Sequence, residues 1–160
     1  MQIRDLAAVE APLIAQFYRE APEYWLLAEG VVEPERQAAE FFTDAPPNSD
    51  PAQSHRLGLF LKGRLSGVAE VSYGFPDPDD AYLGLMLLGP WEQGTGHGRA
   101  FLAHAKALAR IRGAPRLYLA VLDANPRGRA FWLREGFSPT GLVRQDADTG
   151  HRVERLAKDL

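Results

Sequence analysis

The sequence predicts an α/β fold, in which one sheet of about seven strands is flanked by helices. Apolar residues recur at steps of three and four in segments 10–21 and 96–112, as they do in amphipathic helices. Short apolar or alternating runs of strand length occupy most of the remaining chain. The length of 160 residues and the hydrophobic content of 46% suit one domain over residues 1–160, with one sizeable core.

The N-terminal half is predicted to hold a strand, three helices and a hairpin. Prolines open two of the helices, where a missing N–H costs nothing. Segment 44–54 has three prolines and no bulky apolar residue, so we expect a mobile loop there. The hairpin is expected to turn at Gly63-Arg64. In chain order the elements are a strand at 3–6, helices at 10–21, 22–30 and from Pro34 onward, and hairpin strands at 57–61 and 65–73.

The C-terminal half changes from strand to helix patterns twice. A proline- and aspartate-rich turn at 76–80 precedes a strand that we expect to be buried and central. Gly113 and Pro115 end the long amphipathic helix that follows. The expected elements are strands at 82–88 and 116–122, helices at 96–112 and 126–135, and a closing hairpin of 137–144 with 152–158.

Composition excludes several classes of protein. The formal net charge of −3 offers no positive field for nucleic acid or an anionic membrane surface. The absence of cysteine removes disulfides and thiolate nucleophiles. Histidines 55, 104 and 151 show no metal spacing, so no metal is expected. With no apolar run long enough to span a bilayer and no signal-like N-terminus, we expect a soluble, cytoplasmic protein.

The glycine-rich segment between the strand at 82–88 and the next helix is the most informative motif. Glycines at alternating positions allow backbone N–H groups to turn inward, and the helix that begins there adds its positive dipole end. A phosphate or pyrophosphate site is one interpretation, and a tight strand-to-helix turn is the other. Rossmann and P-loop fingerprints do not fit the spacing. The residues concerned are Gln93, Gly94, Thr95, Gly96, His97 and Gly98.

Two blocks together resemble the GNAT superfamily of N-acetyltransferases. The first is Gln93-x-x-Gly96-x-Gly98, and the second runs from Asn125 to Phe137 one strand later. The resemblance covers residues 57–145 and implies a mixed, mostly antiparallel sheet, split between its fourth and fifth strands. It also implies an acetyl-CoA donor and an acyltransferase activity, without metal.

The resemblance assigns most of the site to the acyl donor. The loop amides would hold the CoA pyrophosphate, and the pantetheine would lie in the split. The Leu88 N–H would then point at the thioester carbonyl as an oxyanion donor. Arg99 is a candidate phosphate contact, and Asn125 and Phe131 belong to the same slot.

The proton-transfer groups are less evident from the sequence. Trp132 stands where many family members have a tyrosine that protonates the departing thiolate; water, Tyr73, Tyr82 or Tyr118 are alternatives. The strand at 82–88 has no carboxylate, which leaves Glu70 as the candidate base or ammonium anchor. The competing interpretation is that Glu70 is one outward position of an alternating strand.

We expect the acceptor to be an amine of a small molecule or peptide, attacked directly in a ternary complex. Tyr24 and Trp25, with Tyr18, can form an aromatic wall, and aspartates 77, 79 and 80 can attract a cation. A monomer or a homodimer is expected. The rival functions are a CoA-binding module without catalysis and a nucleotide-binding enzyme unrelated to acyl transfer.

Overall fold

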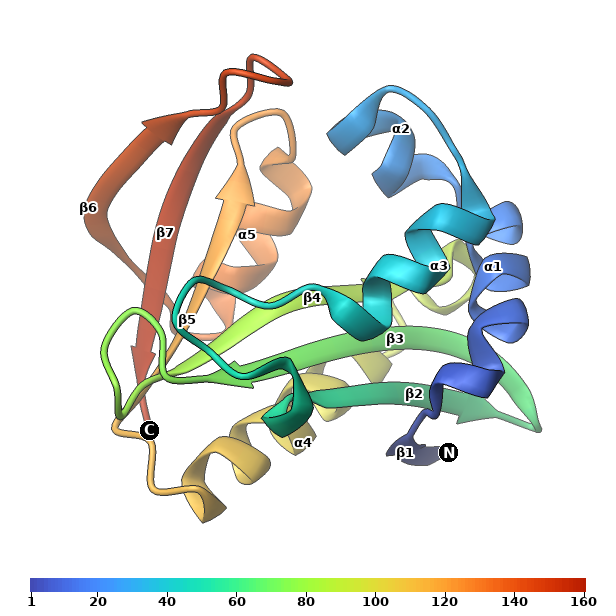
Figure 1. The fold of residues 1–160 in the computed structure, drawn as a ribbon, viewed down its shortest axis with the longest axis horizontal. Coiled ribbons are helices and arrows are strands. Elements are labelled where there is room, and N and C mark those ends of the chain that lie inside the picture. Colours follow the sequence, from blue (N-terminus) through green and yellow to red (C-terminus); the bar gives the residue numbers. More distant parts are fainter.

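The computed structural model describes residues 1–160 as one seven-stranded sheet with helices on both faces (Figure 1). The order of the elements is the one expected from the sequence. The strands are β1 (Gln2–Asp5), β2 (His55–Leu61), β3 (Arg64–Tyr73), β4 (Ala81–Leu88), β5 (Arg116–Leu122), β6 (Ser138–Gln145) and β7 (Arg152–Asp159). The helices are α1 (Ala11–Glu20), α2 (Glu23–Glu29), α3 (Pro34–Thr43), α4 (His97–Ile111) and α5 (Pro126–Arg134), with short 3-10 turns η1 (Ala8–Glu10), η2 (Pro51–Gln53) and η3 (Pro90–Glu92).

The sheet has the order β1-β2-β3-β4-β5-β7-β6. Only β4 and β5 are parallel, and they pair at just two positions, Ala81 with Leu117 and Tyr82 with Tyr118. Beyond Tyr82 the two strands separate, as Figure 1 shows. This confirms the mixed sheet with a split between the fourth and fifth strands. The backbone groups that face the split are free for a ligand.

Two apolar clusters cover the two faces of the sheet. Side chains alternate along β3, so Ala69 and Val71 point to one face, where α4 and α5 pack. Val68 points to the other face and packs with α1 and α3. Glu70 shares the face of Val68, so its carboxyl group points towards the N-terminal helices.

The turn between β2 and β3 differs from the prediction by one residue. Lys62 and Gly63 occupy the turn, with φ of 49° and 78°, and Leu61 pairs with Arg64. A tight hairpin of this kind needs positive φ at both central positions, which glycine adopts without strain. The prediction of Gly63-Arg64 as the turn is therefore wrong, because Arg64 is already the first residue of β3.

The loop expected at 44–54 contains the 3-10 turn η2, whose start is capped by the Asp50 side chain accepting from the Ala52 N–H at 3.0 Å. The strand expected to be buried is only partly so: Ala81 and Leu83 of β4 are buried, whereas Gly84 is exposed. The reason is the split, which removes a neighbouring strand from most of β4. No helix of the structure combines the length and apolar character that crossing a membrane requires.

Candidate active site

The split between β4 and β5 holds a cavity of about 690 Å³, which we call the donor cavity. One wall consists of Leu83–Leu88 from β4, and the other consists of Leu119–Leu122 from β5. Residues at the start of α4 and α5 line its far end. The cavity therefore runs along two strands whose facing edges have no partner strand.

The backbone of β4 presents two amides to this cavity. The Gly89 N–H donates to the Ser66 carbonyl at 2.8 Å, so it points towards β3. Backbone groups along an antiparallel strand alternate between its two sides. The N–H of Leu87 consequently turns to β3, and the N–H groups of Met86 and Leu88 turn to the split.

The glycine-rich loop lies at the end of the donor cavity. Gly94 and Gly96 have φ of 81° and 87°, a region that other residues enter at a cost. Gly98 lies on the first turn of α4, and a Cβ there would sit 3.0 Å from Leu88 Cδ1. Glycine at these positions brings the loop backbone and the positive end of α4 up to the cavity. Of the residues predicted to bind the donor, those that line it are Leu88, Gln93, Gly94, Gly96, Gly98, Arg99, Asn125 and Phe131.

Thr95 and His97 do not line the cavity, because their side chains turn to Glu92. Thr95 Oγ1 donates to the Glu92 carbonyl at 2.6 Å. His97 Nδ1 lies 2.9 Å from Glu92 Oε2 and 2.8 Å from Thr95 Oγ1. These contacts cross-link the loop. Glu92 itself lines the donor cavity, so its carboxylate is one negative group beside the glycine-rich loop.

Several arginines surround the same end. Arg99 has an exposed side chain and lies 3.3 Å from Glu135 Oε1. Arg127 and Arg134 also line the cavity, whereas Arg129 is held by Glu154 at 2.7 Å. Asn125 has a structural task as well, since its side chain accepts the Gly128 N–H at 3.0 Å and caps α5.

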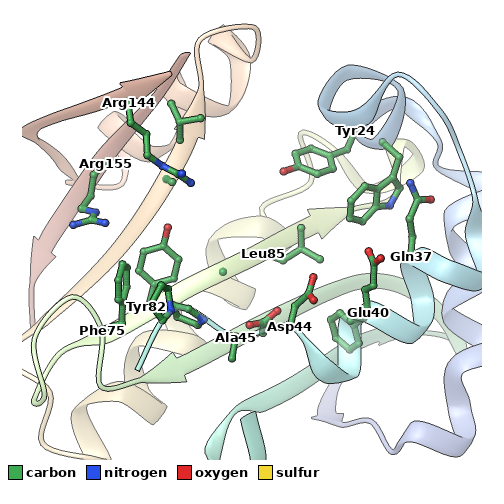
Figure 2. A pocket seen from close by; sticks show the side chains of 18 of the residues that line it. Tyr24, Gln37, Glu40, Asp44, Ala45, Phe75, Tyr82, Leu85, Arg144 and Arg155 are labelled. Atoms are coloured by element: carbon green, nitrogen blue, oxygen red, sulfur yellow. The ribbon is translucent and has the colours of Figure 1, made fainter. Parts of the chain in front are cut away.

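A second cavity of about 540 Å³, which we call the acceptor cavity, opens on the face that carries the N-terminal helices. Aromatic side chains from several elements line it, and Figure 2 shows Tyr24, Phe75 and Tyr82 around its interior. Tyr18 and Trp25 line it too, which agrees with the aromatic wall expected from the sequence. The two cavities share Tyr24, Gly84, Leu85 and Ala120. A group at this junction is in reach of ligands in both.

Glu70 lies in the wall of the acceptor cavity and is only 6% exposed. Arg56 is its direct cross-strand partner in β2, and Arg56 Nη1 lies 3.0 Å from Glu70 Oε2. Ser72 Oγ donates to Glu70 Oε1 at 3.2 Å. Arg56 Nη1 also donates to the Phe41 carbonyl at 2.8 Å, which ties this pair to the end of α3. Glu70 points to the face of the sheet opposite that of Ala69 and Val71, as the alternating pattern of β3 predicts. Its side chain is nevertheless buried and does not face solvent.

Burial raises the pKa of Glu70 to about 7, although the Arg56 charge and the Ser72 hydrogen bond act in the opposite direction. The Asp44 carboxylate adds to the increase. A carboxyl group in this range exchanges a proton near neutral pH, which is the property of a general base.

Gly84 places the Glu70 carboxyl at the junction. Gly84 is the extra residue of a β-bulge in β4, opposite Glu70 and Val71. A Cβ on Gly84 would lie 3.0 Å from Glu70 Oε1, so any other side chain would compete with the carboxyl group for this space. Gly84 belongs to both cavities, so its missing side chain leaves an opening between them beside the Glu70 carboxyl, although Glu70 itself lines only the acceptor cavity.

The residues considered as proton donors to the departing thiolate lie at different places in the structure. Trp132 lines the donor cavity, but it is only 9% exposed and packs edge-on against Phe137. Tyr73 and Tyr118 line neither cavity, and Tyr82 lines the acceptor cavity alone. Tyr24, which the sequence indicated only as part of an aromatic wall, lines both.

The acidic turn does not take part in either cavity. Asp80 is buried, and its carboxylate accepts the Asp77 N–H at 3.3 Å, which is ordinary turn chemistry. Asp77 and Asp79 line neither cavity, so the expectation that this turn attracts a cationic acceptor is not supported by its position. No group of three or more acidic or histidine side chains is placed to bind a metal ion.

Sequence reasoning missed part of the acceptor cavity. Asp44, Ala45, Pro46 and Pro47 come from the segment expected to be an irregular loop. Arg144 and Arg155 come from the closing hairpin, at the opposite side of the cavity (Figure 2). No local motif marks these residues. The one available signal was the alternation of side chains along the hairpin strands. Alternation predicts which face of the sheet a side chain points to, but not which residues lie next to it.

Comparisons with known proteins agree on one family. The sequence model of the Acetyltransferase (GNAT) family matches residues 14–137. A mycothiol acetyltransferase of Beutenbergia cavernae is 39% identical over 70 residues, which make up 42% of this chain and 24% of that protein. The match thus spans about a quarter of that relative's length.

Solved structures share the whole fold. An acetyltransferase of Thermus thermophilus is 24% identical, with a TM-score of 0.78 over 99% of this chain and 96% of that one. The PaiA N-acetyltransferase of Thermoplasma acidophilum, solved in complex with coenzyme A, is 19% identical, with a TM-score of 0.72 over 99% of this chain and 98% of that one.

Proposed function

This chain belongs to the Acetyltransferase (GNAT) family, and we propose that it transfers an acetyl group from acetyl-CoA to a primary amine by direct attack of the amine. The observation that carries this proposal is the junction of the two cavities at Tyr24, Gly84, Leu85 and Ala120. A donor in the split and an acceptor on the helical face meet there without a covalent enzyme intermediate. The acceptor is an amine of a small molecule or peptide.

The residues of the donor cavity fit acetyl-CoA, which supplies the acetyl thioester when bound. The loop from Gln93 to Gly98 offers backbone N–H groups and a helix start to a pyrophosphate. Gly98 leaves room at the point where a Cβ would meet Leu88. The two free amides of β4 suit the polar groups of an extended pantetheine arm. Arg99, Arg127 and Arg134 are placed for the nucleotide phosphates, while Asn125 and Phe131 close the slot.

The two amides of β4 that face the split are proposed to bind different parts of the donor. Leu88 lies next to the glycine-rich loop, and Met86 lies next to the junction residues Gly84 and Leu85. We therefore propose the Met86 N–H as the donor that stabilises negative charge on the thioester carbonyl oxygen. The Leu88 N–H, to which the family resemblance gave that role, then holds the pantetheine, and both amides remain part of the site.

Glu70 is the proposed base. At neutral pH an amine is mostly protonated, and removing its proton at pH 7 costs roughly 4–5 kcal/mol when its pKa is about 10.4. A carboxyl group with a pKa of about 7, at the opening beside Gly84, can take that proton directly or through water. Arg56 orients the carboxylate from the side away from the cavity.

Tyr24 is the proposed proton donor to the departing thiolate. Trp132 cannot serve, because an indole N–H is not acidic near neutral pH. Tyr24 lines both cavities, and Figure 2 shows its hydroxyl group directed into the space between the helices and the sheet. Burial raises the pKa of Tyr24, so the phenol is protonated at working pH.

The second candidate function is a CoA-binding module without catalysis. The observation that favours it is the burial of Trp132 in the core at the position of the family tyrosine. Calorimetry with coenzyme A and thiol release from acetyl-CoA over a panel of amines separate the two functions. We expect binding in the micromolar range and thiol release with at least one class of amine. Binding without thiol release for any amine would favour the second function, and no binding at all would overturn both.

A further inference from the structure

The acceptor cavity is polarised from one side to the other. Carboxylates come from the side of α3 and β3, namely Glu40, Asp44 and Glu70. The opposite wall, formed by β6 and β7, contributes the cations Arg144 and Arg155 (Figure 2). Between them lie the aromatic side chains. A ligand that spans the cavity therefore meets negative charge at one end and positive charge at the other.

The two arginines are not neutralised by the protein. Other arginines on nearby elements are paired, such as Arg116 with Asp159 and Arg129 with Glu154. Arg144 and Arg155 have no carboxylate within ion-pair distance. Arg155 instead lies over the Phe75 ring, 4.9 Å from its centroid, which holds the guanidinium group at the cavity wall. Their donors are free for an anion.

The interior supplies a further donor without a partner. Tyr18 is fully buried, and its hydroxyl group has no hydrogen-bond partner although it lines the cavity. A buried polar group in that state is normally satisfied by a ligand or water. Tyr82 also lines the cavity, between the arginines of one wall and Asp44 of the other (Figure 2).

We propose that the acceptor carries, besides its amine, an oxyanion that Arg144 and Arg155 bind, with an apolar or aromatic body between the two groups. The amine faces Glu70 at the junction, and the oxyanion faces the β6–β7 wall. Guanidinium groups recognise carboxylate and phosphate by the same donor geometry. The same arginines repel an acceptor that carries only positive charges, such as a polyamine. This inference rests on the proposed acetyl transfer and specifies its substrate class.

The test uses acceptors that differ in one group only. 4-(Aminomethyl)benzoate, its carboxamide and benzylamine share the amine and the ring but carry a carboxylate, a neutral amide or neither, with the ring between the two groups. Short peptides with free or amidated C-termini extend the distance between the charges, and amines bearing a phosphate monoester distinguish that source of oxyanion from a carboxylate. We expect kcat/KM to favour the oxyanion member of at least one matched set by roughly 10-fold or more.

Arg144→Gln and Arg155→Gln are expected to remove that preference, mainly by raising KM for the anionic acceptor roughly 10- to 100-fold, while the neutral analogue is unaffected. Arg152→Gln is the matched control, because Arg152 is an exposed arginine of β7 that lines neither cavity. Equal turnover of anionic and neutral members in every set, a preference for polyamines, or a preference unchanged in both variants would overturn the proposal.

A binding experiment separates this inference from the proposed function. 4-(Acetamidomethyl)benzoate and its carboxamide are titrated by calorimetry into the protein saturated with coenzyme A. If no amine is acetylated but the carboxylate binds in an arginine-dependent way, the oxyanion site stands and the acetyl transfer fails. If no amine is acetylated and neither arginine variant changes binding, both are overturned.

Discussion

The donor and acceptor cavities are built in different ways, although they meet at four residues. The donor cavity is lined along its length by the backbone of one stretch, β4 and the loop that leads into α4, with charged side chains such as Arg99, Arg127 and Arg134 at its far end. The acceptor cavity takes its polar groups from side chains on several elements, which are α1, α2, α3, β3, β4, β6 and β7. A backbone site can bind the same donor while side chains vary, whereas a side-chain site changes with each substitution. Variants should therefore divide into those that change CoA affinity and those that change turnover.

The largest effect is expected at Glu70. Glu70→Gln removes the base, so kcat/KM for the acceptor should fall about 100- to 10,000-fold. The change in rate near pH 7 should disappear from the pH–rate profile, because it reports the pKa of Glu70, which is about 7. CoA affinity should be unchanged.

The control for this variant is Glu40→Gln, a carboxylate of the same cavity that is already paired with Arg36 at 3.0 Å. Its kcat/KM should stay within about fivefold of the parent. If Glu70→Gln behaves like Glu40→Gln, Glu70 is not the base.

Arg56→Gln should cost about 1–3 kcal/mol of unfolding free energy, because Glu70 and the Phe41 carbonyl lose a buried hydrogen-bond donor while Glu70 takes up a proton. Loss of the positive charge also raises the pKa of Glu70, so the activity limb should move to higher pH. Urea denaturation and pH–rate profiles measure the two effects. Arg36→Gln, on an exposed network with Glu29, Glu33 and Glu40, should leave the unfolding free energy nearly unchanged.

The stability of the parent protein should fall as pH rises from about 5 to about 8. The pKa of Glu70 is raised from 4.5 to about 7, so in this window the folded state holds a proton that the unfolded state has released. Ionisation at higher pH therefore removes stability, by up to roughly 3 kcal/mol. The Glu70→Gln variant lacks this slope, and the difference between the two denaturation series isolates it. If the stabilities of the parent and the variant change with pH by the same amount, the pKa of Glu70 is not raised.

Gly98→Ala acts on the donor cavity instead. The added Cβ would lie 3.0 Å from Leu88 Cδ1 and 3.6 Å from Phe131 Cζ. Displacement of Leu88 should weaken CoA binding by about 1–2 kcal/mol, roughly 5- to 30-fold, with kcat at saturating donor little changed. Gly113→Ala is the control, because it strains a positive φ in open space away from both cavities. A fall in kcat without weaker CoA binding would contradict the expectation that a change in the donor cavity acts on CoA affinity.

The smallest effect is expected at His97. His97→Ala removes the hydrogen bond between His97 Nδ1 and Glu92 Oε2, so the Glu92 carboxylate is no longer held away from the phosphates of a bound donor. CoA affinity should fall about two- to fivefold, and more at low ionic strength. Adding Glu92→Gln should restore the affinity. If His97→Ala alone binds CoA more tightly, the contact between His97 and Glu92 does not shield the glycine-rich loop from the Glu92 charge.

The donor cavity could be predicted from the sequence because its determinants are local. Glycines at 94, 96 and 98 specify backbone conformations within a few residues, and the apolar period of α4 places a helix start beside them. The split followed from the family resemblance. The ion pair of Glu70 with Arg56 could not be predicted, because the two residues become neighbours only through the register of β2 and β3.

The order of strands and helices, the glycine-rich loop and the seven-stranded class could all be read from the amino-acid sequence, since each depends on periodicity and on local backbone preference. The side chains that face one another across the acceptor cavity became evident only in the folded chain. Sheet order places β6 and β7 opposite α3, and thereby Arg144 and Arg155 opposite Glu40 and Asp44. Such proximity between distant segments arises because the whole sheet packs as one unit, and no local pattern encodes it.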